Sequence, residues 1–148
     1  MAKGAIAGNS GLALRLLALC VGVFFLAMAA NKIAWLTNSD LLLERFQRWA
    51  PHARPWVRWY LERIAIPGAP VFARVVPIAE FCTSLALIIG FWPRLAAALA
   101  LLMVLNFHFA TASFWSADFL RDGTGPPLLG ALLALAIGGN RMPWVFRN

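Results

Sequence analysis

Residues 71–113 read VFARVVPIAEFCTSLALIIGFWPRLAAALALLMVLNFHFATAS, and this stretch decides the fold. It contains two apolar runs, 71–91 and 95–113, separated by the turn Trp92-Pro93-Arg94. A helix rises about 1.5 Å per residue, so about 20 apolar residues cross the roughly 30 Å of hydrocarbon in a bilayer. The first run carries one charge near its middle, Glu80. The stretch therefore predicts two antiparallel membrane-spanning helices.

Two further apolar runs flank this hairpin, at residues 12–36 and 126–144. The last run begins at Pro126-Pro127, and proline suits the first turn of a helix. Its apolar part, residues 126–138, is only marginally long enough to cross the bilayer. The sequence thus predicts an all-α integral membrane protein. Its single domain, residues 1–148, is expected to be a four-helix transmembrane bundle with spans at about 12–36, 71–91, 95–113 and 126–144. Four crossings place both termini on the same side, and we expect a multi-pass protein of the cell inner (cytoplasmic) membrane.

Composition supports lipid as the surrounding medium. The 148 residues are 61% hydrophobic and 13% charged, whereas soluble domains are about 45–50% apolar and about 25% charged. A soluble protein of this size could not hide so much apolar surface. The net charge of +7 comes from basic residues between the apolar runs, where anionic headgroups lie, so no nucleic-acid partner is expected. Neither a CxxC pair, an HExxH helix nor a P-loop occurs, so no metal site and no intrinsic cofactor is predicted.

Residues 40–66 differ from the spans because apolar and aromatic side chains alternate there with five arginines. Ser39 or Asp40 can begin a helix that Pro51 ends, and Pro55 can begin a second one. An apolar-aromatic face opposite an arginine-rich face is typical of helices that lie in the membrane interface. A solvated loop and a docking lid for a partner subunit remain alternatives. The residues expected to contact the interface are Arg45, Arg48, Trp49, Trp56, Arg58, Trp59 and Tyr60.

Four polar residues fall within the spans or at their ends, in the half of the bilayer next to residues 40–66. They are Lys32, Glu80, Asn106 and His108. An ionisable residue inside a span is costly unless it has a partner, so each is a candidate for function. Asn106 and His108 are two residues apart, about 200° around a helix, and cannot both face the same neighbour.

This polar cluster has two interpretations. In the structural one, Glu80 pairs with Lys32 or accepts a hydrogen bond from Asn106, which holds the helices in register. In the functional one, the cluster binds and protonates a lipid-soluble quinone, with His108 or Glu80 as proton donor and aromatic walls such as Phe107.

Several motifs in the central stretch resemble the DoxX superfamily, in particular its DoxD-like branch, the small membrane subunit of thiosulfate:quinone oxidoreductase. They are Glu80, Leu87-Ile88-Ile89-Gly90, Phe91, Arg94-Leu95-Ala96-Ala97 and Leu105-Asn106-Phe107. The resemblance implies a four-helix membrane protein that serves a redox assembly feeding the quinone pool. A chain this short without a cofactor motif is not expected to be catalytic alone, so electrons would come from another subunit.

Three functions are therefore weighed. The first is a membrane subunit of a quinone-linked redox complex, which supplies an anchor and a quinone-side pocket. The second is a non-catalytic accessory subunit of a respiratory or photosynthetic complex, which packs lipid or pigment. The third is a small transporter. It has little support, because the spans contain one buried carboxylate and the sequence shows no inverted repeat. Expected partners are the lipid bilayer and other membrane or peripheral subunits.

Overall fold

A computed structural model describes residues 2–146, with side chains from Ser10 onward. The described chain is helical, and three of its helices are long and apolar enough to cross a membrane: Ser10–Ala30 within α1 (Ala2–Ala30), α4 (Ala69–Ile89) and α5 (Pro93–Ala110). The sequence placed the second and third spans within three residues of these bounds. The first predicted span ran to residue 36, but α1 ends at Ala30 and a 3₁₀ turn, η1 (Ile33–Leu36), follows.

The fourth predicted span is only partly helical. α6 (Pro126–Gly138) has 13 residues and rises about 20 Å, short of the roughly 30 Å of hydrocarbon. The predicted continuation to residue 144 is wrong, because only a 3₁₀ turn, η6 (Gly139–Arg141), follows. Glycine has low helix propensity, and Met142 is extended, the conformation favoured before a proline such as Pro143.

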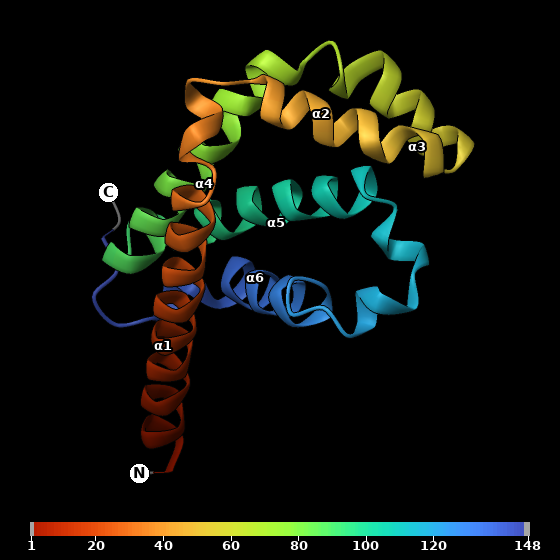
Figure 1. The fold of residues 1–148 in the computed structure, drawn as a ribbon. Coiled ribbons are helices and arrows are strands. Elements are labelled where there is room, and N and C mark those ends of the chain that lie inside the picture. The colour runs from red at the N-terminus through yellow and green to blue at the C-terminus, as the bar shows by residue number, and fades with distance from the viewer. Residues whose placement is uncertain (1, 147–148) are drawn as a thin grey trace.

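α1 and α4 run side by side in opposite directions, and α5 and α6 form a second antiparallel pair (Figure 1). The main hydrophobic core lies between these helices and includes Phe25, Leu87, Ala97 and Leu132. α1 and α4 approach closely at Gly22, where a Cβ would lie 2.7 Å from Cγ1 of Ile88. Small residues at such contacts are typical of helix packing in lipid.

The region around the α4–α5 turn is fixed by arginines and by the C-terminal segment. The Arg15 side chain donates to the carbonyls of Leu87 and Ile88 at 3.2 and 2.7 Å, at the end of α4. Arg94 Nε donates to the carbonyl of Ala136 at 2.9 Å, at the end of α6. Gly90 ends α4 with φ +85°, and a Cβ there would lie 2.7 Å from the Trp144 carbonyl oxygen. The two arginine side chains satisfy helix carbonyls that would otherwise lack donors.

Residues 40–65 extend sideways from the end of α1 and the beginning of α4, and they lie above α5 in the view of Figure 1. They form α2 (Asp40–Trp49), η2 (Ala50–His52), α3 (Pro55–Tyr60) and the π-helical turn η3 (Leu61–Ala65). Pro51 and Pro55 separate the helices, as the sequence predicts. Because of their position over α5, residues 40–65 are named the covering segment.

The aliphatic face of the covering segment is buried against protein rather than exposed to lipid. Leu42, Phe46, Val57 and Leu61 form a second hydrophobic core with small residues of α4, such as Ala73. The sequence pattern revealed an amphipathic segment but not what covers its apolar face. Two of its aromatic side chains, Trp56 and Trp59, remain exposed.

Candidate functional site

A buried ion pair joins α4 to the residue that follows α1. Lys32 Nζ lies 2.7 Å from Oε1 and 2.9 Å from Oε2 of Glu80, and the two residues are only 6% and 3% exposed. The arrangement matches the structural interpretation in which Glu80 pairs with Lys32. Asn106, the alternative partner of Glu80, binds elsewhere. The pair links the end of α1 to α4 in a buried position, where a single charge without a partner would be costly.

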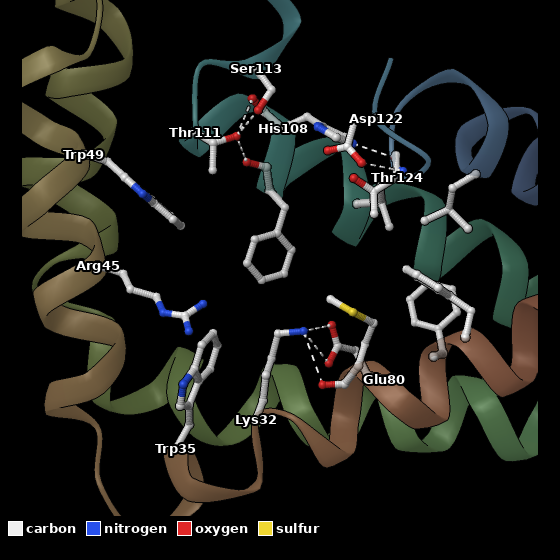
Figure 2. Close-up of a pocket in the computed structure, with 16 residues that line it drawn as sticks. Lys32, Trp35, Arg45, Trp49, Glu80, His108, Thr111, Ser113, Asp122 and Thr124 are labelled. Carbon is white, nitrogen blue, oxygen red and sulfur yellow. Dashed lines mark hydrogen bonds and ion pairs between the residues drawn. The ribbon is translucent and has the colours of Figure 1, made fainter. Parts of the chain in front are cut away.

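The ion pair lies at one side of a cavity of about 240 Å³ beneath the covering segment (Figure 2). Phe24, Phe25 and Met28 of α1 and Val104 and Phe107 of α5 supply most of the apolar lining. Trp35, Arg45 and Trp49 line one end of the cavity, while His108, Thr111, Ser113, Asp122 and Thr124 line the other. The cavity therefore has apolar walls with polar groups at both ends, the usual construction of a site for a small organic ligand.

His108 and Asn106 face in different directions, as their spacing predicts. His108 is buried, lines the cavity, and its Nε2 lies 2.7 Å from the carbonyl oxygen of Thr124. Asn106 points away from the cavity, and its Oδ1 accepts a hydrogen bond of 2.8 Å from the Tyr60 hydroxyl. The structure thus brings Lys32, Glu80 and His108 to one cavity and leaves Asn106 outside it.

Arg45 extends from α2 into the space between Trp35 and Trp49 (Figure 2). Its guanidinium carbon lies 5.1 Å from the centre of the Trp35 ring. No hydrogen bond or ion pair holds the Arg45 side chain within the part of the chain that the structure describes. Since the ion pair neutralises Lys32, Arg45 gives this end of the cavity an uncompensated positive charge with free N–H donors.

The other end of the cavity carries negative charge at the water-exposed surface. The backbone N–H of Thr124 donates to Oδ1 of Asp122 at 2.9 Å. This bond and a bond with the Thr124 side chain hold the pKa of the Asp122 carboxyl below its usual range. Asp122 is therefore ionised at neutral pH, close to His108. Thr111 and Ser113 are hydrogen-bonded to each other nearby through their hydroxyls.

The residues predicted to contact the membrane interface occupy several different environments. Arg45 and Trp49 line the cavity. Arg58 donates to the carbonyls of Ala50 and Pro51 at 3.1 and 2.8 Å, and so holds the two halves of the covering segment together. Arg48, Trp56 and Trp59 are exposed, whereas Tyr60 binds Asn106.

Several residues of the cavity were missed from the sequence. Trp35, Asp122 and Thr124 follow or precede the spans and carry no motif of their own. They line the cavity because of the positions of the segments that follow α1 and precede α6. No local sequence pattern predicts these positions.

Comparison with known proteins gives one match. A family model described as DoxX matches residues 11–113, which include α4, α5, the whole covering segment and all of the apolar part of α1 except Ser10. Neither a curated protein nor a solved structure matches the chain.

Proposed function

This chain belongs to the DoxX family of membrane proteins, and on that premise we propose that it is a membrane subunit of a quinone-linked redox complex. It supplies an anchor and a pocket for the quinone headgroup beneath the covering segment. The observation that carries the proposal is the amphipathic cavity with Arg45 unpaired at one end and aromatic side chains around it. Electrons reach the quinone from a cofactor on another subunit.

The size of the cavity supports a headgroup rather than a whole lipid-soluble molecule. Sites that enclose a drug-sized ligand hold roughly 300–1,000 Å³, whereas this cavity holds about 240 Å³. One substituted ring fits such a volume, while an isoprenoid tail remains in the surrounding lipid. Stacking against Trp35 and Phe107 suits a flat ring.

The polar groups suit the two oxygens of a quinone. Arg45 donates to one ring oxygen from the end beneath α2, and its charge stabilises negative charge that develops there on reduction. His108 lines the opposite end, next to the exposed Asp122 carboxylate, and is the proton donor that this proposal assigns to that side. The Lys32–Glu80 pair fixes the helices that form the wall between these ends.

A photoreactive short-tailed quinone tests this proposal when it is added to the protein in lipid nanodiscs and the labelled peptides are identified by mass spectrometry. We expect the label on peptides that contain Trp35, Arg45 or Phe107, and we expect excess unlabelled quinone to prevent it. Label that spreads over the lipid-facing side of α4 and α5, and that unlabelled quinone does not reduce, would contradict the proposal.

A second function is favoured by an apolar groove between α4 and α5. This groove, of about 360 Å³, is lined by small and aliphatic side chains, among them Ala79, Ala86, Leu99 and Met103. It suits an acyl chain or a pigment tail, as expected of an accessory subunit that packs lipid or pigment within a larger respiratory or photosynthetic complex. Mass spectrometry of the protein purified in mild detergent distinguishes the two functions, since co-purifying pigment supports the accessory role.

We also propose that α6 makes a fourth crossing, which completes a four-helix bundle in the inner (cytoplasmic) membrane with both termini on one side. Two contacts support this arrangement. The Phe146 N–H donates to the Gly90 carbonyl at 3.0 Å, and Arg15 caps α4 beside the same turn. Local thinning of the bilayer accommodates a short span at modest cost. Reporter domains fused to either end are expected to report the same side, and opposite sides would contradict the proposal.

A further inference from the structure

Arg54 packs against two tryptophan rings from different parts of the chain. Its guanidinium carbon is 5.7 Å from the centre of the Trp56 ring and 5.4 Å from that of Trp115. The two rings also contact each other edge to face, with centroids 6.1 Å apart. Trp56 belongs to α3, whereas Trp115 belongs to η4 (Ser113–Trp115), which follows α5. The unit formed by Arg54, Trp56 and Trp115 is named the Trp–Arg clamp.

The clamp positions the Arg54 guanidinium without using its hydrogen-bond donors. A guanidinium has five N–H donors in its plane, and attraction to aromatic rings leaves these donors available. In the part of the chain that the structure describes, the Arg54 side chain makes no hydrogen bond and no ion pair. Arg58, only four residues away, is instead hydrogen-bonded to two backbone carbonyls of the covering segment. The donors of Arg58 are therefore used within the protein, whereas those of Arg54 are available to a ligand outside the chain.

The position of the clamp relative to the membrane indicates what that partner is. α5 ends at Ala110, so Trp115 lies just beyond the end of a membrane-spanning helix. Trp56 and Trp115 are 52% and 43% exposed, and the nearby aliphatic residue Leu120 is 73% exposed. Exposed tryptophans at this level lie among lipid headgroups, where their rings prefer to be. The clamp therefore holds a cation at headgroup depth.

We propose that the Trp–Arg clamp binds the phosphate of an anionic phospholipid headgroup. Bidentate pairing of guanidinium with phosphate is favourable, and the tryptophan rings fix the orientation in which it occurs. Binding there holds α3 and the α5–α6 connection to the same lipid and so steadies the covering segment. The inference does not depend on what occupies the cavity.

Native mass spectrometry of the protein, released from nanodiscs that contain equal amounts of phosphatidylglycerol and phosphatidylcholine, tests the clamp. The wild-type protein is expected to retain phosphatidylglycerol preferentially. Arg54→Gln is expected to lower that preference at least about tenfold, because a hydrogen bond to a charged group contributes about 1.5–3 kcal/mol and each 1.4 kcal/mol corresponds to about tenfold. Arg54→Lys keeps the charge but loses the planar donors, and is expected to restore only part of the preference.

Arg63→Gln is the matched control, because Arg63 is an exposed arginine of the same segment without an aromatic or hydrogen-bonded partner in the described residues. This variant is expected to lower the preference by no more than about fivefold, the effect of one basic side chain near an anionic surface. Equal losses in the two glutamine variants would overturn the proposal, because they would reduce it to general attraction between charges. Displacement of phosphatidylglycerol by millimolar inorganic phosphate would overturn it too, since the site would then recognise free phosphate rather than lipid. Thermal stability of each variant, measured in parallel, shows that the protein remains folded.

Discussion

Glu80→Gln is expected to lower the free energy of unfolding by about 3–5 kcal/mol, the usual effect of removing one partner from a buried ion pair. In the wild-type protein both carboxylate oxygens of Glu80 bind Lys32 Nζ, at 2.7 and 2.9 Å. A glutamine amide keeps one acceptor but loses the charge, so the Lys32 ammonium stays buried without a countercharge, with only the Trp35 and Phe107 rings beside it. Its other hydrogen bond, to the Met28 carbonyl, is long at 3.5 Å and cannot replace the carboxylate.

Thermal unfolding in detergent, followed by size-exclusion chromatography of a fluorescent fusion, measures this loss. The control is the double variant Lys32→Met/Glu80→Met, which removes both charges and leaves apolar side chains of suitable length. It is expected to recover most of the lost stability, because replacing both members of a buried pair is often neutral. A single variant as stable as the wild-type protein would show that the pair is not structural.

Much of the fold follows from the sequence, because crossing a bilayer imposes a length and an apolar composition that few other structures share. The turn before Pro93 and the breaks at Pro51 and Pro55 were predicted for local reasons, the fixed φ of proline and its missing N–H. The end of α6 was not predicted correctly. The length needed to cross a bilayer suggested a longer helix, but Gly138, Gly139 and the extended residue before Pro143 stop it.

The site could be predicted only in part. The cost of placing a polar or ionisable side chain within a membrane span identified Lys32, Glu80 and His108 as candidates. Helical spacing showed that the side chains of Asn106 and His108 must point in different directions. Which of the two faces the cavity depends on the rotation of α5 within the bundle, and this is set by packing far along the chain. The positions of Arg45 and Arg54 could not be predicted either, because they too depend on packing between distant parts of the chain. Both belong to an arginine-rich segment, and only the folded chain places one beside Trp35 in the cavity and the other against two exposed tryptophans.

Arg45→Gln is expected to weaken binding of a quinone to the cavity about 10- to 100-fold. A hydrogen bond to a charged group contributes about 1.5–3 kcal/mol, and each 1.4 kcal/mol corresponds to about tenfold in Kd. Arg45 makes no hydrogen bond or ion pair within the described residues, so the substitution leaves no buried partner unsatisfied. Its effect on the stability of the protein is expected to be small, which separates it from Glu80→Gln.

Arg48→Gln provides the matched control, because Arg48 is an exposed arginine of the same helix that does not line the cavity. It changes the net charge of the covering segment by the same amount as Arg45→Gln. Any difference between the two variants therefore reports the position of the guanidinium rather than the overall charge.

A quinone site beneath the covering segment is tested most directly by the affinity of a short-tailed quinone for the protein in nanodiscs. Quenching of tryptophan fluorescence measures this affinity in the wild-type protein, Arg45→Gln and Arg48→Gln. We predict saturable binding by the wild-type protein and by Arg48→Gln, with Kd raised at least about tenfold in Arg45→Gln. Binding that does not saturate, or the same Kd in all three proteins, would contradict a quinone site at this position.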